Sequence, residues 1–196
     1  MGKLFVVSGP SGVGKTTLVN ALLCMESINK KCKRVVTYTT RPPRQDEVEG
    51  VDYYFISLEE FELKEKECFF LETTIFCGNK YGSPAFIIDT AARIEKSFIF
   101  VVDQEGAKRL RGFEGVVLIW IRPKTKEELV RRLEKRDRNF VDNINKRLEK
   151  AQKQLECEEF DRMYDYHIVN GDFNKALYEL ESLLVREIGE NLRCDN

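Results

Sequence analysis

The feature that most constrains the fold is residues 9–16, Gly-Pro-Ser-Gly-Val-Gly-Lys-Thr, which fit the pattern G-x-x-x-x-G-K-[ST]. An apolar run at 4–7 precedes them and a helical apolar pattern follows at 18–23, so the order is strand, loop, helix. A glycine-rich loop in that place turns its backbone N–H groups and the helix N-terminus toward one point, where they hold an anionic phosphate. The pattern therefore predicts a phosphate-binding loop.

Two side chains of this loop have their own expected chemistry. Lys15 would bring a positive charge to the β- and γ-phosphates of a nucleotide, and the Thr16 hydroxyl would bind Mg²⁺. A plain glycine turn between a strand and a helix requires neither side chain. Their presence therefore favours nucleotide binding over a purely structural turn.

Composition excludes several classes of protein. With 42% hydrophobic and 33% charged residues among 196, the chain is typical of one globular domain. The formal net charge of −1 argues against a general nucleic-acid binder. The longest apolar run, 116–121, is far shorter than the roughly 20 residues that cross a bilayer, and the N-terminal residues lack a secretory signal pattern. We therefore expect a cytoplasmic protein without membrane or nucleic-acid partners.

Cysteine and histidine chemistry has little support. The six cysteines are scattered without a C-x-x-C pair, so a zinc site or a redox pair is not indicated. The single histidine, His167, lies in a short apolar run and is most simply a strand residue. Catalysis by a histidine base is therefore not expected.

Strand and helix patterns alternate along the chain, which predicts an α/β fold with a parallel sheet. Strands are expected at 4–7, 34–38, 53–56, 68–76, 97–102, 116–121 and 166–169. Further helices are expected at 58–66, from Ser83-Pro84, at 106–111, at 126–136, after Asp142 and after Asp172. Ligands in such folds bind at the carboxyl ends of the strands, where the phosphate loop and Asp103 both fall.

The segment 39–55 narrows the function. Its pattern Thr-Thr-Arg-Pro-Pro-Arg-x-x-Glu-x-x-Gly-x-x-Tyr-x-Phe resembles the signature of guanylate kinases, the P-loop nucleoside monophosphate kinases that transfer the γ-phosphate of ATP to GMP. Phe70-Leu71-Glu72, Tyr81-Gly82-Ser83 and Ile-Asn-Lys-Arg-Leu at 144–148 agree with the same family in the same order. The resemblance covers about residues 4–188.

The resemblance implies the architecture and the reaction. The fold would be a parallel core sheet flanked by helices, with a small mixed GMP-binding subdomain and a helical lid. Residues 1–196 would form one domain, with an ATP-binding core at about 1–36, 95–125 and 149–190, a GMP-binding subdomain at 37–94 and a lid at 126–148. The reaction would be Mg²⁺-dependent phosphoryl transfer from ATP to GMP and dGMP, giving ADP and GDP for purine nucleotide metabolism.

The resemblance also implies site residues. ATP would be bound by Gly9, Pro10, Ser11, Gly12, Val13, Gly14, Lys15, Thr16, Thr17, Arg136 and Asn170. GMP would be bound by Thr37, Arg41, Arg44, Tyr53, Glu72, Tyr81, Ser83 and Asp103. The catalytic residues would be Lys15, Arg41, Arg132, Arg136 and Arg147. The metal ligand would be Thr16, with Asp103 in the outer shell of the ion.

These implied roles agree with the chemistry of the ligands. Arginine forks suit phosphate oxygens, and tyrosine hydroxyls add neutral donors. A carboxylate such as that of Glu72 accepts from both N1–H and N2–H₂ of guanine. The acceptor oxygen of GMP is already anionic, so catalysis can come from alignment and charge neutralisation without a general base.

For several of these residues, a structural or surface role without ligand binding remains an alternative. Either Arg41 or Arg44 alone is compatible with a solvated loop charge, and Glu72 with a solvent-facing strand position. The arginines expected in the lid also fit the surface of an amphipathic helix.

Departures from the family pattern affect the metal site and the lid. Val101 stands where the family has the first aspartate of D-x-D-x-Q-G, and Glu105 replaces its glutamine. Asp46 stands where a glycine is common, a turn position that aspartate tolerates. Lys135 and Asp137 replace glycines of the lid, which predicts a stiffer lid hinge.

Three other functions compete with this one. Guanylate-kinase-like domains of membrane-associated scaffolds bind partners without catalysis, but their phosphate loops are typically degraded. A kinase for another phosphorylated acceptor should lack the guanine-reading residues. A GTPase would carry N-K-x-D, which residues 79–82 begin but do not complete. The sequence leaves the oligomeric state open.

Overall fold

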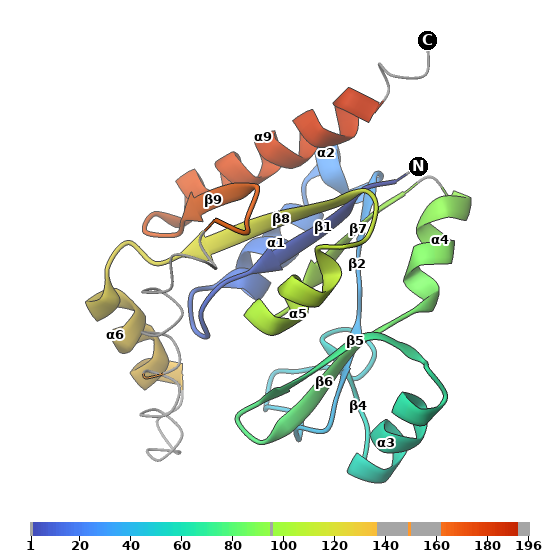
Figure 1. Cartoon of the computed structure of the whole chain (residues 1–196). Helices are drawn as coiled ribbons and strands as arrows, with labels where there is room; N and C mark the ends of the chain where they lie inside the picture. Colours follow the sequence, from blue (N-terminus) through green and yellow to red (C-terminus); the bar gives the residue numbers. More distant parts are fainter. Residues whose placement is uncertain (1, 95, 137–148, 150–161, 192–196) are drawn as a thin grey trace.

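The computed structural model describes residues 2–94, 96–136, 149 and 162–191, which contain two β-sheets (Figure 1). The strands of the core sheet are β1 (Leu4–Ser8), β2 (Cys32–Arg34), β7 (Ser97–Val101), β8 (Val116–Arg122) and β9 (Tyr166–Val169). They lie in the order β2-β7-β1-β8-β9, and every neighbouring pair is parallel. The predicted parallel core sheet is confirmed.

The central strand β1 is buried on both faces. Phe5 and Val7 belong to one hydrophobic cluster, and Leu4 and Val6 belong to a second cluster on the other side. Successive side chains of a strand point to opposite faces, so helices on both sides must cover them. This is why residues 4–7 form a continuous apolar run instead of an alternating one.

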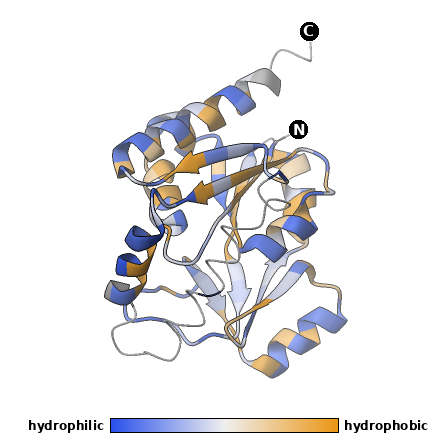
Figure 2. Ribbon diagram, turned by 60° about the vertical axis from the view of Figure 1, so that its left-hand side comes forward, coloured by the Kyte–Doolittle hydropathy of each residue, from blue (hydrophilic) through white to orange (hydrophobic). Residues whose placement is uncertain are grey.

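Helices cover both faces of the core sheet. They are α1 (Lys15–Leu23), α2 (Glu26–Asn29), α4 (Phe86–Ile94), α5 (Gln104–Leu110), α6 (Lys126–Arg136) and α9 (Phe173–Asn191). The first cluster contains residues of α1, α2, α6 and α9, and the second contains residues of α4 and α5. Hydrophobic and hydrophilic residues lie on different sides of α9 (Figure 2), as expected for a helix with one buried face. No helix in the described ranges combines the length and the apolar character needed to cross a membrane.

The second sheet lies below the core sheet in Figure 1. Its strands are β3 (Thr37–Thr39), β4 (Tyr53–Phe55), β5 (Phe70–Phe76) and β6 (Asn79–Pro84), in the order β4-β3-β6-β5. The β3–β4 pair is parallel and the other two pairs are antiparallel. The predicted mixed sheet is therefore present, and helix α3 (Leu58–Lys66) packs on it through Phe61, which stacks on Phe70 with ring centroids 4.5 Å apart.

The prediction of one strand at 34–38 is wrong. β2 ends at Arg34 in the core sheet, and β3 begins at Thr37 in the second sheet. Val35, Thr37 and Thr39 are all buried, so the alternation of buried positions runs through the passage between the sheets. A pattern with period two therefore gives no sign of the break.

The prediction of a helix start at Ser83-Pro84 is also wrong. These residues end β6, and α4 begins at Phe86. Pro84 is paired with Phe70 of β5 only, because the pairing of β6 with β3 involves Tyr81 and Gly82. Proline lacks an N–H group and is tolerated at such a strand end.

The two expected capping boxes have different outcomes. At α3, Ser57 Oγ accepts from Glu60 N at 3.1 Å and Glu60 Oε2 accepts from Ser57 N at 2.9 Å, so the box is complete. At α6, Thr125 Oγ1 accepts from Glu128 N at 3.2 Å, but the carboxylate of Glu128 accepts from Arg132 instead. The helix expected after Asp142 lies outside the described residues.

Candidate functional site

The glycine loop lies between β1 and α1, as predicted. Gly9, Gly12 and Gly14 have φ values of 151°, 84° and 96°. A Cβ atom at Gly9 would lie 2.1 Å from Ile121 O, and one at Gly14 would lie 2.7 Å from Asn170 Nδ2. The loop therefore needs glycine both for its backbone conformation and for its close approach to β8 and to Asn170.

Lys15 lies over this loop. Its Nζ donates to Gly9 O at 2.7 Å and to Pro10 O at 3.1 Å. Thr16 and Thr17 follow in the first turn of α1, with Thr16 half-buried and Thr17 exposed. A cation, a hydroxyl and the N-terminus of a helix therefore meet at the carboxyl end of the central strand, which is an anion-binding arrangement.

Two residues from distant parts of the chain hold the loop from its other side. Asn170, which follows β9 and is 3% exposed, donates from Nδ2 to Val13 O at 2.7 Å. Arg132 of α6 donates from one nitrogen to Val13 O at 3.1 Å and from another to Asn170 O at 3.0 Å. Asn170 was expected at the ATP site and Arg132 among the catalytic residues, and both lie against the loop. Arg136 is the last residue of α6, and Arg147 lies outside the described residues.

The residues expected to read guanine gather on the second sheet. Thr37 of β3, Glu72 of β5 and Ser83 of β6 are 6%, 5% and 0% exposed. Ser83 Oγ donates to Glu72 Oε1 at 2.6 Å. The solvent-facing alternative for Glu72 is therefore wrong.

Only one of the two carboxylate oxygens of Glu72 accepts a hydrogen bond within the described part of the chain. Within the described ranges, its Oε2 is buried without a hydrogen-bond partner. Burial, together with the nearby charge of Asp103, raises the pKa of Glu72 to about 7, against the opposing effect of the hydrogen bond from Ser83. A buried carboxylate oxygen without a donor is costly, and a ligand with N–H groups would satisfy it.

Asp103 lies at the carboxyl end of a core strand, beside the helix that approaches the second sheet. It follows β7 and caps α5, where its Oδ1 accepts from Gly106 N at 3.0 Å. A Cβ atom at Gly106 would lie 3.0 Å from Glu72 Oε2, so the start of α5 closely approaches Glu72. Because β7 runs parallel to β1 and pairs with it, Asp103 and the phosphate loop both lie at the carboxyl ends of core strands.

The four residues expected at the GMP phosphate also lie in one region. Arg41 and Arg44 are in the loop between β3 and β4, Tyr53 is in β4, and Tyr81 is in β6. The ring centroids of the two tyrosines are 6.0 Å apart, and the guanidinium of Arg41 lies 5.5 Å from the Tyr53 ring centroid. Burial and the neighbouring Tyr81 raise the pKa of Tyr53, which therefore remains a neutral donor.

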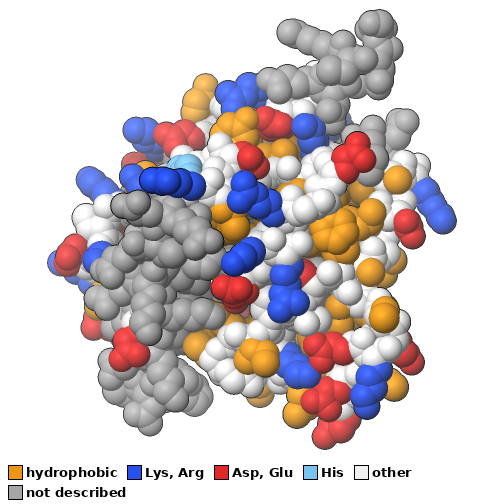
Figure 3. All heavy atoms as spheres, in the orientation of Figure 1, with side chains coloured by type: hydrophobic (Ala, Val, Ile, Leu, Met, Phe, Trp, Pro, Cys, Tyr) orange, Lys and Arg blue, Asp and Glu red, His pale blue; other side chains and the backbone are white. Residues whose placement is uncertain are grey.

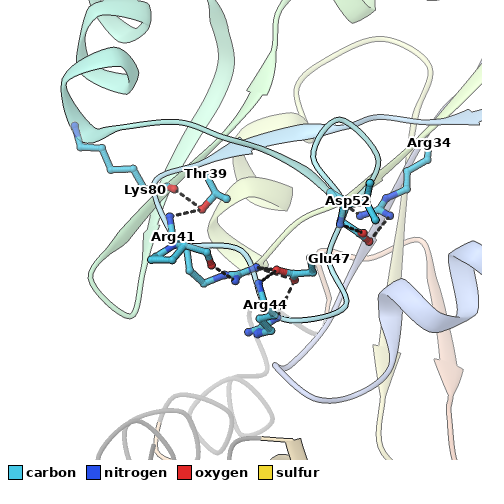
Figure 4. A network of polar contacts seen from close by, with 9 residues as sticks. Arg34, Thr39, Arg41, Arg44, Glu47, Asp52 and Lys80 are labelled. Carbon is cyan, nitrogen blue, oxygen red and sulfur yellow. Dashed lines mark hydrogen bonds and ion pairs between the residues drawn. The ribbon is translucent and has the colours of Figure 1, made fainter.

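Sequence reasoning missed the acidic partner of these arginines. The carboxylate of Glu47 accepts hydrogen bonds from both Arg41 and Arg44 (Figure 4). Glu47 is part of the signature quoted above, so its position was visible, but no role had been assigned to it.

A second missed contact connects α1 to the same loop. Arg34 donates to Asp52 O at 3.1 Å and to Asn20 Oδ1 at 3.2 Å (Figure 4 shows the Asp52 contact). Asn20 lies in α1 and Asp52 immediately precedes β4. No sequence signal pointed to it, because the three residues are far apart in the chain.

The charges on the visible surface are mixed. On the face seen in Figure 3, Lys and Arg side chains are interspersed with Asp and Glu side chains among the described residues. The described side chains visible there form no continuous basic stripe for a nucleic-acid backbone.

Comparisons with known proteins agree on one family. The guanylate kinase family model matches residues 1–187. A guanylate kinase of Haemophilus influenzae is 41% identical over 191 residues, covering 95% of this chain and 88% of that protein. One of Protochlamydia amoebophila is 39% identical over 186 residues, covering 95% and 91%. A crystal structure of guanylate kinase from Anaplasma phagocytophilum has a TM-score of 0.75 at 32% identity, covering 95% of this chain and 86% of that chain. The chain belongs to the guanylate kinase family.

Proposed function

We propose that this chain transfers the γ-phosphate of ATP to GMP or dGMP, giving ADP and the nucleoside diphosphate. The observation that carries the proposal is the buried carboxylate of Glu72, which binds Ser83 through one oxygen and keeps the other without a donor among the described residues. Guanine carries the N1–H and N2–H₂ donors that such an oxygen needs.

On the acceptor side, each residue has a distinct task. Glu72 accepts from the guanine edge, and the hydroxyls of Thr37 and Ser83 bind the base beside it. The phosphate of GMP is bound by Arg41, Arg44, Tyr53 and Tyr81. Adenine has an acceptor at N1 and no N2 amine, so AMP would leave the Glu72 carboxylate poorly paired.

On the donor side, the backbone N–H groups of residues 9–16 surround the ATP phosphates. Lys15 neutralises charge on the transferred phosphoryl group, where electrostatic stabilisation matters most. Arg132 and Asn170 support the loop through Val13 O. We assign Arg136 and Arg147 to the closing lid on the family pattern alone.

The donor set at the loop fits Mg²⁺. The Thr16 hydroxyl is a hard oxygen ligand, and the described residues contain no group of three or more His, Cys, Asp or Glu that could hold an ion by themselves. Mg²⁺ typically binds one or two protein oxygens together with substrate phosphates and waters. When bound, the ion would neutralise phosphate charge. Asp103 would stand in its outer shell, and Val101 offers no second carboxylate there.

We further propose the division of labour along the chain that the family pattern suggests. Residues 1–36, 95–125 and 149–190 would form the ATP-binding core, 37–94 the GMP-binding subdomain and 126–148 the lid. Support comes from the second sheet, whose strands all fall within 37–94. The expected cytoplasmic location remains a prediction.

A coupled assay tests the function. Purified protein is given ATP, Mg²⁺ and one nucleoside monophosphate at a time, and formation of ADP is followed. We expect turnover with GMP and dGMP, far less with AMP, CMP and UMP, and loss of turnover with EDTA that added Mg²⁺ restores. Tight GMP binding without turnover would indicate a binding module, and preference for another acceptor would indicate a different kinase.

A further inference from the structure

Glu47 connects the two arginines of the loop between β3 and β4. Arg41 NH2 lies 2.8 Å from each of its carboxylate oxygens. Arg44 NH1 lies 3.2 Å from Oε1, and the backbone N of Arg44 lies 2.9 Å from Oε2. One carboxylate therefore binds both guanidinium groups and the backbone between them (Figure 4).

This carboxylate is fixed in place. Glu47 N donates to Arg44 O at 3.1 Å, so a turn joins the two residues through the backbone in addition to their side chains. The side chains of Arg41 and Glu47 are only 11% and 14% exposed. If Glu47 swung away, the backbone N–H of Arg44 and two arginines would lose their acceptor together.

The arginines can keep Glu47 and still bind a phosphate. Glu47 engages one side-chain nitrogen of each guanidinium, and a guanidinium carries five N–H groups. Arg41 NH1 also donates to Pro42 O at 2.6 Å, and the N–H groups that are still left on the two guanidinium groups suit phosphate oxygens. The Arg41 guanidinium also lies 5.5 Å from the Tyr53 ring centroid and 5.8 Å from that of Phe55, so its plane is confined on more than one side.

We propose that Glu47 is a positioning residue for the GMP phosphate: it holds Arg41 and Arg44 in their binding orientation before GMP arrives and remains bound to them afterwards. The inference rests on the proposed function, since it takes the arginines to be the phosphate ligands. Glu47 contacts the arginines and not the substrate, so its effect on GMP is indirect.

A competing role makes the opposite prediction. If Glu47 merely occupied the phosphate position and had to be displaced, removing its charge would strengthen GMP binding. A positioning role predicts weaker binding, even though the variant has one fewer negative charge near the phosphate. The sign of the change therefore separates the two roles.

The test compares GMP with guanosine, which lacks the phosphate. Calorimetry measures GMP binding and NMR titration measures guanosine binding to the full-length protein, Glu47→Gln and Glu47→Asp. Glu47→Gln keeps the shape without the charge, and Glu47→Asp keeps the charge on a side chain one methylene shorter. We expect Kd for GMP to rise at least tenfold in both, guanosine binding to change less than twofold, and KM for ATP to stay unchanged.

Glu49→Gln is the matched control. Glu49 lies in the same loop, but its carboxylate accepts from the backbone N of Phe55 at 3.0 Å, a bond that glutamine can also accept. We expect GMP binding in this control to equal that of the parent protein.

Three results would overturn the inference. Unchanged or tighter GMP binding in Glu47→Gln would exclude positioning, and parental affinity in Glu47→Asp would mean that charge alone suffices. An equal loss for guanosine would mean that the whole subdomain has been disturbed. The variant Arg41→Ala tests the proposed function itself. If Arg41→Ala binds GMP as tightly as the parent protein, Arg41 does not bind the GMP phosphate, and the inference about Glu47 fails with that assignment.

Discussion

The titration of Glu72 should make the stability of the protein depend on pH. Burial, with the charge of Asp103 nearby, raises the pKa of Glu72 from its usual 4.5 to about 7. Between these values the folded chain binds more protons at this site than the unfolded chain does. The stabilising contribution of protonated Glu72 is fully present below pH 4.5 and is lost as the pH rises through 7.

Glu72→Gln should therefore flatten the pH dependence of stability. Glutamine cannot ionise, so the variant should lose about 2 to 3 kcal/mol less unfolding free energy than the parent between pH 5 and pH 8. Urea denaturation of both proteins at the two pH values measures this. Parallel curves would show that Glu72 does not titrate in this range.

The same residue should determine the choice of acceptor. Glu72→Ala should lower kcat/KM for GMP by at least about a hundredfold, the loss expected for a charged hydrogen-bonded pair in a closed site. AMP cannot make that pair, so its kcat/KM should fall much less. An unchanged ratio of GMP to AMP efficiency would mean that other residues read guanine.

At the residue scale, the signature predicted which side chains gather but not all of their partners. Thr37, Glu72 and Ser83 lie on neighbouring strands of the second sheet, while their roles toward a ligand remain predictions. The contact of Glu47 with Arg41 depends on how a proline-containing loop folds over six residues. Spacing alone cannot distinguish that contact from two solvated charges.

At the scale of single elements, Asp103 illustrates how one residue can serve both structure and site. Its Oδ1 caps α5 by accepting from Gly106 N, and asparagine caps helices about as well as aspartate. Asp103→Asn and Asp103→Ala both remove the charge near Glu72. Asp103→Asn should therefore exceed Asp103→Ala in unfolding free energy by about 1 kcal/mol, the typical value of a cap.

Chemical denaturation of the two variants side by side provides the measurement. Equal stabilities would mean that the cap contributes nothing to α5. If both variants nevertheless lose GMP turnover, the carboxylate acts on the reaction separately from its effect on the helix.

Whole elements were predicted well where one physical signal dominates. The continuous apolar runs at 4–7, 97–102 and 116–121 form β1, β7 and β8, and α3 begins at the capping box of Ser57 as expected. The errors at 34–38 and at Ser83-Pro84 occur where the chain passes between sheets or leaves one. There the tertiary arrangement, and not the local pattern, decides where a strand ends.

At the scale of the whole molecule, the residues proposed to bind ATP and those proposed to bind GMP belong to different sheets. The phosphate loop follows β1 of the core, whereas Glu72 and the two arginines belong to the second sheet and its loop. We predict that the 37–94 segment closes on the core when both nucleotides are bound, because closure would bring GMP to the γ-phosphate and exclude water. The lid at 126–148 is expected to close with it.

Spin labels can follow this closure. Ile75 in β5 and Tyr178 in α9 are 68% and 69% exposed, so labels there should not disturb packing. We expect the distance between them to shorten when GMP and an ATP analogue bind together, and to shorten less with either ligand alone. A distance that stays constant at saturation would contradict closure.

The second sheet is formed by one continuous segment of the chain, inserted between two strands of the core sheet. The path leaves the core sheet after β2 and returns through α4 to β7, the strand that pairs with β2. Phe61, Phe69, Phe70 and Tyr38 form their own aromatic group, separate from the two core clusters.

We therefore expect the second sheet to unfold separately from the core sheet. In native-state hydrogen exchange, amides of β5 and β6 should exchange through an opening that leaves β1, β7 and β8 protected. Equal exchange free energies for both sets of strands would contradict this. If GMP binds as proposed, to β3, β5 and β6 of the second sheet and to Asp103 of the core, it should bring the two exchange free energies closer together, so that the substrate couples the two halves of the enzyme into one cooperative body.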